Sequence, residues 1–209
     1  MPSPLKNHWD EKYASTPLTQ LGWYEAQPQP SIQLIENCAI PRQATIIDIG
    51  SGASTLISRL LELGYQNLYA LDISPIALEK AKTSLGTEQA ARIHWLEEDI
   101  TQPSAILQIP NIAIWHDRAV FHFLTENHER EIYREILQKN IKPGGFIILA
   151  AFALNGATKC SGLPVQRYSA QSLCEFLGAG FTLLESLDFT YQMPSGDLRP
   201  YVYTRFQKG

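Results

Sequence analysis

The chain has 209 residues, of which 44% are hydrophobic and 18% charged, and its formal net charge is −4 at pH 7. This length suits one domain with a full hydrophobic core, and the composition is that of a soluble globular protein. No apolar run reaches the roughly 18 residues that span a bilayer, and no block of Lys and Arg favours a nucleic-acid partner.

The N-terminal 30 residues are polar and rich in aromatic residues (Trp9, Tyr13, Trp23, Tyr24). The first residues lack the apolar core of a signal peptide. The three cysteines (Cys38, Cys160, Cys174) are too widely spaced for a disulfide framework or a zinc site. We therefore expect a cytoplasmic protein with no metal, no membrane partner and no nucleic-acid partner.

After residue 30, helical and strand-like patterns alternate along the chain. In order, they predict a helix at 31–39, a strand at 44–50, a helix at 54–64, a strand at 67–74, a helix at 75–86, strands at 92–100 and 111–117, a helix at 127–141, a turn at 143–145, a strand at 146–154 and a helix at 169–180. Residues 181–193 and 200–208 resemble a closing antiparallel pair.

This alternation predicts an α/β fold with a doubly wound, mostly parallel seven-stranded sheet and an antiparallel C-terminal strand. Residues 1–40 are expected to form a lid or helical segment, and residues 41–209 the ligand-binding domain of one compact unit. The loop at 153–168 has no regular pattern, and a loop of that length is usually functional or disordered.

Two glycines, Gly50 and Gly52, follow the strand predicted at 44–50. In such a sheet the ligand crevice lies at the carboxyl ends of the strands, where the strand order reverses. Glycine there lets the backbone approach a ligand closely, although a tight turn alone also needs glycine.

An acid, Asp72, ends the next strand about twenty residues later. A carboxylate at that place can accept hydrogen bonds from both ribose hydroxyls. Asp72 could instead cap the helix that begins at Pro75. Taken together, the glycines and Asp72 point to an adenosine-containing cofactor.

The third glycine of a dinucleotide fingerprint is absent, because Thr55 stands at its position. Asp48, two residues before the first glycine, suits a cofactor whose free amino-acid end carries an ammonium group. S-adenosylmethionine has such an end. No Tyr-x-x-x-Lys pair supports the alternative of a dehydrogenase.

These motifs resemble those of the class I S-adenosylmethionine-dependent methyltransferases over nearly the whole chain. DIGSG, with Asp48, Gly50, Ser51 and Gly52, resembles the first motif, and LDIS, with Asp72 and Ile73, the ribose-binding motif. The resemblance implies that Asp99 meets the adenine amino group and that Ile100 lies beside the ring. Ser54 departs from the family, which often has a third glycine there.

The N-terminal pattern HWDEKY…GWYE resembles a subset that includes small-molecule and protein-lysine methyltransferases. The resemblance implies a lid in which Trp9 and Tyr13 cover the cofactor and Trp23 contacts substrate. The alternative is that these aromatics only attach the N-terminal segment to the domain.

The segment WHDRAVFHFL follows the fourth strand and is expected to face the crevice. Asp117, His122 and His116 are candidate catalytic residues, with Asp117 or His122 as base and His116 near the cofactor. Arg118 is expected to hold a carboxylate substrate; an Asp–Arg pair that only braces the crevice is the alternative. Two phenylalanines are also expected to contact the substrate: Phe121 and Phe152.

We therefore expect methyl transfer from S-adenosylmethionine to a small molecule by in-line displacement, leaving S-adenosylhomocysteine. Methylation of a lysine on a partner protein is the alternative. The Asn/Asp-Pro-Pro-aromatic motif of adenine-N6 methyltransferases is replaced by HDRA, which disfavours that class. A non-catalytic cofactor-binding module is a further alternative, which the polar segment after the fourth strand disfavours.

Overall fold

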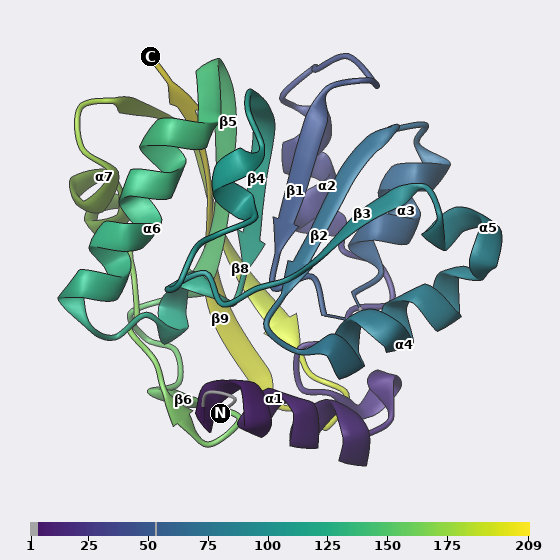
Figure 1. The fold of residues 1–209 in the computed structure, drawn as a ribbon. Helices are drawn as coiled ribbons and strands as arrows, with labels where there is room; N and C mark the ends of the chain where they lie inside the picture. Colours follow the sequence, from purple (N-terminus) through teal and green to yellow (C-terminus); the bar gives the residue numbers. More distant parts are fainter. Residues whose placement is uncertain (1–3, 53) are drawn as a thin grey trace.

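The computed structural model describes residues 4–52 and 54–209 (Figure 1). The helices are α1 (Pro4–Ser15), α2 (Gln29–Glu36), α3 (Leu56–Glu62), α4 (Pro75–Leu85), α5 (Thr87–Ala90), α6 (Asn127–Asn140) and α7 (Ala170–Leu177), with 3₁₀ turns η1 (Leu18–Gln20), η2 (Ile106–Gln108) and η3 (Phe121–Phe123). The strands are β1 (Thr45–Ile49), β2 (Asn67–Asp72), β3 (Ile93–Glu97), β4 (Ile112–Arg118), β5 (Ile141–Phe152), β6 (Lys159–Cys160), β7 (Leu163–Pro164), β8 (Phe181–Gln192) and β9 (Leu198–Lys208).

Seven strands form one sheet in the order β3-β2-β1-β4-β5-β9-β8. The pairs from β3 to β5 are parallel, and β9 runs antiparallel to both β5 and β8. The prediction of a mostly parallel seven-stranded sheet with an antiparallel C-terminal strand is therefore confirmed. The order reverses between β1 and β4, so a ligand crevice is expected at their carboxyl ends.

Helices cover both faces of the sheet, with α6 and α7 on one side and α2 and α3 on the other (Figure 1). The strands of the sheet centre are buried on both faces, which explains their unalternating apolar sequence. Successive β4 residues divide between the two cores, because side chains alternate along a strand. Trp115 packs in the core beneath α6, and Ile114 packs in the core beneath α2 and α3.

The predicted turn at 143–145 lies inside β5 and does not precede it. Gly144 has a φ of 73°, and the register with β4 shifts between Ile112 and Ile114. A Cβ on Gly145 would lie 3.0 Å from the Ile112 carbonyl oxygen. The glycines therefore allow an irregular stretch of strand where a pattern of turn residues predicted a break.

The N-terminal helix α1 lies across the carboxyl ends of the central strands (Figure 1). Its Asp10 accepts a 2.6 Å hydrogen bond from the Ser74 hydroxyl at the start of α4, and Lys6 pairs with Glu97 at 2.6 Å. The loop at 153–168 carries the small β6–β7 hairpin near α1. Among the helices of the described residues, none is long and apolar enough to cross a membrane.

Candidate active site

The glycine turn after β1 requires glycine for two physical reasons. Gly50 and Gly52 have φ values of 62° and 51°, which side chains with a Cβ rarely adopt. In addition, a Cβ on Gly50 would lie 2.0 Å from Val120 Cγ2, and one on Gly52 would lie 2.2 Å from the Tyr13 hydroxyl oxygen. The turn is therefore a place of close backbone approach under the N-terminal segment.

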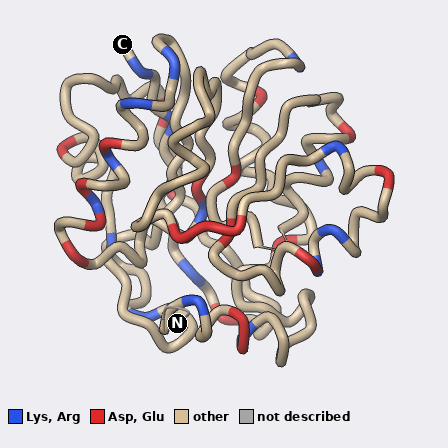
Figure 2. The backbone as a smooth tube through the Cα atoms, viewed as in Figure 1, with Lys and Arg blue, Asp and Glu red and all other residues tan. Residues whose placement is uncertain are grey.

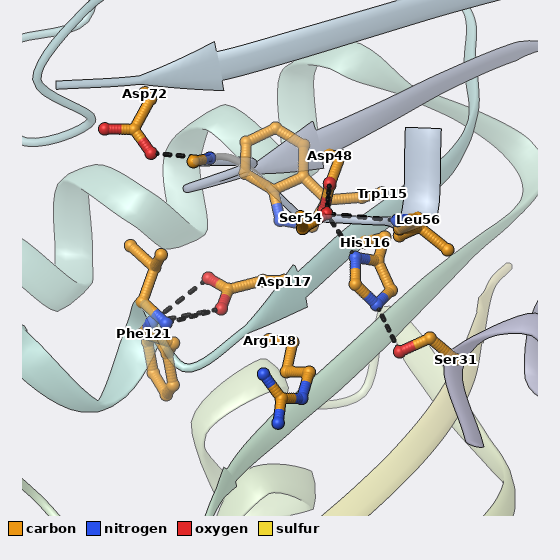
Figure 3. Close-up of polar contacts among 12 residues, drawn as sticks. Ser31, Asp48, Ser54, Leu56, Asp72, Trp115, His116, Asp117, Arg118 and Phe121 are labelled. Carbon is orange, nitrogen blue, oxygen red and sulfur yellow. Dashed lines mark hydrogen bonds and ion pairs between the residues drawn. The ribbon is translucent and has the colours of Figure 1, made fainter. Parts of the chain in front are cut away.

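The carboxylate of Asp72 is buried at the end of β2 and held by backbone groups. It accepts 2.8 Å hydrogen bonds from the Gly52 and Ser74 N–H groups (Figure 3 shows Asp72). Burial raises the pKa of Asp72 to about 6, against the opposing effect of these hydrogen bonds. The N-cap of α4 is Ser74, whose hydroxyl accepts from the Ala77 N–H. Asp72 is thus not the helix cap.

A cavity of about 100 Å³ lies beside Asp72. Its wall includes four residues that the sequence assigned to adenosine: Asp72, Ile73, Asp99 and Ile100. Across from them, the wall includes three residues of the N-terminal segment: Trp9, Tyr13 and Trp23.

A second, smaller cavity of about 50 Å³ lies beside the glycine turn. Asp48, Ser51 and His116 line it, and it shares Gly50, Trp23 and Arg118 with the larger cavity. Asp48 Oδ1 lies 2.6 Å from His116 Nδ1, and His116 Nε2 lies 2.8 Å from Ser31 Oγ on α2 (Figure 3). The sequence did not single out Ser31.

The three residues His116, Asp117 and Arg118 do not face one crevice. His116 and Arg118 project from one face of β4, and Asp117 projects from the other, toward α6 (Figure 3). Asp117 accepts hydrogen bonds from Val120 N–H at 3.0 Å and from the Tyr133 hydroxyl at 2.6 Å. It lines neither cavity, and its hydrogen bonds favour a structural role over the predicted role of catalytic base.

His122 is also away from both cavities. It is fully buried, with its ring centroid 4.6 Å from those of Phe123 and Phe152. Burial lowers the pKa of His122 to about 3, and the Arg118 charge acts in the same direction, so the ring is neutral. The prediction of His122 as base is therefore not supported by its position.

The two phenylalanines predicted to contact substrate are core residues. Phe121 packs against Tyr133 and Phe176, 4.9 and 4.6 Å away between ring centroids, and Phe152 packs against Tyr201 at 5.0 Å. Neither lines a cavity described above. Phe123, which the sequence analysis did not select, lines the larger cavity instead. Phe121 and Phe123 both lie in the 3₁₀ turn η3, where residues two apart point in different directions.

Arg118 is the centre of a buried polar and aromatic cluster. Its Nε lies 3.0 Å from Glu25 Oε2 and donates to the Tyr203 hydroxyl at 3.0 Å, while Nη1 donates to the Trp23 carbonyl at 3.0 Å. The guanidinium also lies 5.1 and 5.2 Å from the ring centroids of Tyr191 and Tyr201. The predicted Asp–Arg brace is absent, because Arg118 pairs with Glu25, which the sequence analysis did not select.

The N-terminal aromatic residues attach the N-terminal segment to the domain and also line the site. Trp23 Nε1 donates to the Tyr13 hydroxyl at 3.2 Å, and Trp9 makes edge contacts with Trp23 and Phe123 at 5.5 and 5.2 Å between centroids. Trp9, Tyr13 and Trp23 line the larger cavity at the same time. The two alternatives for these residues therefore do not exclude each other.

The donor set fits an adenosine cofactor with an amino-acid end. A buried carboxylate at the end of β2 suits a pair of hydroxyls, and Asp48 at the end of β1 suits an ammonium group. Gly50 lines both cavities. Across residues 4–52 and 54–209, no cluster of three or more His, Cys, Asp or Glu side chains is placed to hold a metal ion.

Comparison with known proteins agrees with this geometry. Residues 46–145 match a family model described as a methyltransferase domain. EEF1A lysine methyltransferase 2 from Homo sapiens is 24% identical over 202 residues, covering 90% of this chain and 79% of that protein.

Two solved structures have the same fold. A SAM-dependent methyltransferase from Anabaena variabilis has a TM-score of 0.76 and 16% identity, covering 99% of this chain and 96% of that one. The N-methyltransferase NodS from Bradyrhizobium japonicum, solved with S-adenosylhomocysteine, has a TM-score of 0.66 and 17% identity, covering 88% and 89%. The chain therefore contains a methyltransferase domain with the fold of the S-adenosylmethionine-dependent enzymes, and S-adenosylmethionine is its cofactor.

Proposed function

We propose that the protein transfers the methyl group to a small-molecule acceptor that binds beneath α1 and the β6–β7 hairpin. One observation carries this proposal: beyond Asp72, the larger cavity is walled by Trp9, Trp23, Phe123 and Cys160, under the N-terminal segment. Such a mostly apolar space suits a compact acceptor.

In this proposal, the buried acids hold the polar parts of the cofactor. Asp72 accepts hydrogen bonds from the ribose hydroxyls, and Asp99 accepts one from the adenine amino group. Ile73 and Ile100 pack against the adenine ring. Asp48 accepts from the ammonium group, and the Gly50–Gly52 turn lets the backbone approach the methionyl chain.

S-adenosylmethionine, when bound, supplies a methyl group on a cationic sulfonium. The acceptor atom forms a bond to the methyl carbon while the carbon–sulfur bond breaks, and its electron pair stays on sulfur. The task of the protein is then to align the acceptor and to keep water out. Since Asp117 and His122 lie outside both cavities, the acceptor is expected to react with a lone pair that is already free.

A second candidate is methylation of a lysine on a partner protein. The similarity to the human lysine methyltransferase over 90% of this chain favours it. Lys and Arg are interspersed with Asp and Glu along the outer helices, so this view offers no continuous basic face to a nucleic acid (Figure 2).

The proposal is tested with a methyl-labelled donor and a panel of small amines, thiols, carboxylates and phenols, set beside proteins of a cell lysate. Label in a small-molecule product supports the first candidate. A labelled protein band, with no labelled small molecule, would favour the second. Calorimetric titration with S-adenosylhomocysteine and with nicotinamide dinucleotides is the control, and only the first is expected to bind.

A further inference from the structure

The ionisable residues that line the larger cavity are divided between its two sides. Asp72, Glu98 and Asp99 come from the end of β2 and from just beyond β3. Arg118 and Cys160 come from β4 and from the β6–β7 hairpin. Because β2 and β3 lie on one side of β1 and β4 lies on the other, the carboxylates gather on one side of the cavity and the cation on the other.

The loop after β5 adds no carboxylate to the cationic side. Residues 136–174 contain no Asp or Glu, and this stretch includes the whole loop with its Cys160. The loop packs on the start of β9, because the Ala153 N–H donates to the Pro200 carbonyl at 3.0 Å. Arg199 therefore lies next to a loop that has no acidic side chain.

Arg199 lies on the same face of β9 as the tyrosines that contact Arg118. Side chains two residues apart on a strand share a face, so Arg199 is on the face of Tyr201 and Tyr203. Tyr203 accepts from Arg118 Nε at 3.0 Å, and the Tyr201 ring centroid lies 5.2 Å from the Arg118 guanidinium. The ring of Tyr191, which aligns with Arg199 on β8, lies 5.1 Å from the same guanidinium. Arg199 thus extends the Arg118 cluster along β9, past the end of β5.

The charge of Arg199 is not balanced by a carboxylate. Arg118 is paired with Glu25 at 3.0 Å, but Arg199 forms no ion pair within the described part of the chain. Asp197, the nearest acid in the sequence, accepts from the Ser195 hydroxyl at 3.0 Å instead. Of the two arginines, Arg199 is therefore the one that brings a net positive charge to this side of the cavity.

Cys160 connects the two arginines with the cavity, which it lines. Burial raises the pKa of the Cys160 thiol, whereas the Arg199 and Arg118 charges act to lower it, so both guanidinium groups lie within electrostatic reach of the thiol. In addition, Arg118 Nη2 is buried and has no hydrogen-bond partner among the described residues. A buried N–H group without a partner is rare, and it points to a ligand group that accepts a hydrogen bond.

We propose that Arg199, together with the unused N–H group of Arg118, binds an anionic group of the acceptor, a carboxylate or a phosphate, beside Cys160. The assignment rests on the proposed function, in which the acceptor is a small molecule and the acids on the other side hold the cofactor. The apolar part of the acceptor lies against Trp9 and Trp23. The atom that receives the methyl group is then at the other end of the acceptor, toward the cofactor.

The test uses simple probes and needs no turnover. Benzoate, phenyl phosphate and neutral benzyl alcohol share an aromatic ring and differ in the polar group. Each is titrated into the protein saturated with S-adenosylhomocysteine, so that the cofactor already fills its own part of the site. We expect at least one of the two anions to bind about tenfold more tightly than benzyl alcohol, and the tighter anion identifies the group. Raising the salt concentration from about 50 to about 500 mM should reduce this preference, because salt screens a charge contact.

The variant is Arg199→Gln, at a half-buried position where the change leaves no carboxylate without its partner. Its affinity for the preferred anion should fall about five- to tenfold, between the ranges for exposed and buried charge contacts, and its affinity for benzyl alcohol should not change. Arg199→Lys keeps the charge and should keep most of the preference. The matched control, Arg92→Gln, makes the same change in net charge at an exposed position before β3, outside both cavities, and should bind all three probes as wild type does.

Two outcomes overturn the assignment and leave the proposed function standing. In the first, the wild-type protein binds neither anion more tightly than benzyl alcohol. In the second, Arg199→Gln retains the wild-type affinity for the preferred anion, or loses no more than Arg92→Gln. Failure of the proposed function has a different signature, a labelled protein band with no labelled small molecule in the methyl-donor experiment, and the assignment would then fail with it.

Discussion

Asp48 and His116 form a buried pair, with 2.6 Å between Asp48 Oδ1 and His116 Nδ1. The two residues are aligned on neighbouring strands β1 and β4. His116 Nε2 lies 2.8 Å from the Ser31 hydroxyl oxygen, so both ring nitrogens have a polar partner. His116 thus helps to orient the carboxylate of Asp48, and it lines the smaller cavity beside it.

Replacing His116 by alanine removes the partner of a buried carboxylate. We expect the free energy of unfolding to fall by about 1.5–3 kcal/mol, the usual range for a hydrogen bond to a charged group. Urea unfolding at pH 7 measures it. Ser31→Ala should cost less, about 1 kcal/mol, because a neutral hydroxyl is lost. An equal or larger loss for Ser31→Ala would contradict this hierarchy.

Asp72→Ala should weaken S-adenosylhomocysteine binding on the order of 1.5–3 kcal/mol, through loss of charged hydrogen bonds to the ribose. Calorimetric titration provides the measurement. Asp188→Ala, at an exposed position on β8, is the matched control and should bind as wild type. An unchanged affinity in Asp72→Ala would remove this carboxylate from the ribose site.

Acidic pH should weaken cofactor binding through the same residue. The pKa of Asp72 is raised by burial to about 6, so at pH 5 about one molecule in ten has the ionised carboxylate. Because of this carboxylate, we expect the affinity for S-adenosylhomocysteine to be about tenfold lower at pH 5 than at pH 8. The Asp72→Asn variant should show no such pH dependence.

Stability without ligand should change in the opposite sense over this range. The folded-state pKa of Asp72 lies above the ordinary aspartate value of 3.8, so the folded chain holds this proton more tightly than the unfolded chain. This residue therefore lowers stability as the pH rises from about 4 to about 6, and its effect is constant above that. Asp117, whose pKa burial also raises to about 6, has the same sign. Urea unfolding of Asp72→Asn beside wild type at pH 4.5 and pH 7 isolates the Asp72 contribution.

Asp117→Asn separates a structural role from a catalytic one. We expect the free energy of unfolding to fall by about 1–3 kcal/mol, because Asn cannot accept from all of its backbone and Tyr133 partners. Cofactor affinity should be unchanged, and turnover of an identified acceptor should be retained in the folded variant. A loss of turnover by about 100- to 10,000-fold would restore Asp117 as a base.

Trp23→Leu tests whether the aromatic wall attracts the sulfonium. Trp23 lines both cavities. A cation–π contact adds roughly 0.5–2 kcal/mol, so the variant should lose that much more affinity for S-adenosylmethionine than for neutral S-adenosylhomocysteine. Trp95→Leu, a half-buried Trp on β3 outside both cavities, is the control. An equal loss of affinity for both ligands would mean that Trp23 only attaches the N-terminal segment to the domain.

Much of the fold was predictable because each central strand is buried on both faces and therefore has an unbroken apolar sequence. Asp48 and Asp72 were predictable as crevice residues, because parallel strands end at one edge of the sheet. The functional assignment of Asp117 ignored a signal that was present: neighbours on a strand point to opposite faces, so His116 and Asp117 could not share a crevice.

Other parts of the site depend on tertiary contacts that no local pattern contains. Glu25 meets Arg118 from a distant segment, and Tyr203 meets it from β9, two strands away. The irregular start of β5 was also unpredictable, because Pro-Gly-Gly favours a turn locally while pairing with Ile112 extends the strand.

The Tyr13 hydroxyl of the N-terminal segment packs against the backbone of Gly52 in the glycine turn, and this contact affects cofactor affinity. Cavities of about 100 and 50 Å³ are far smaller than the roughly 300–1,000 Å³ of most small-molecule sites. We therefore expect the Tyr13 side chain and the Trp23 indole that donates to its hydroxyl to move when a nucleoside binds in these two cavities. The rearrangement of the N-terminal segment costs free energy. The measured affinity for the cofactor is therefore lower than the contacts in the bound state alone would give. Substitutions that loosen the N-terminal segment without changing a residue that lines either cavity should then tighten binding.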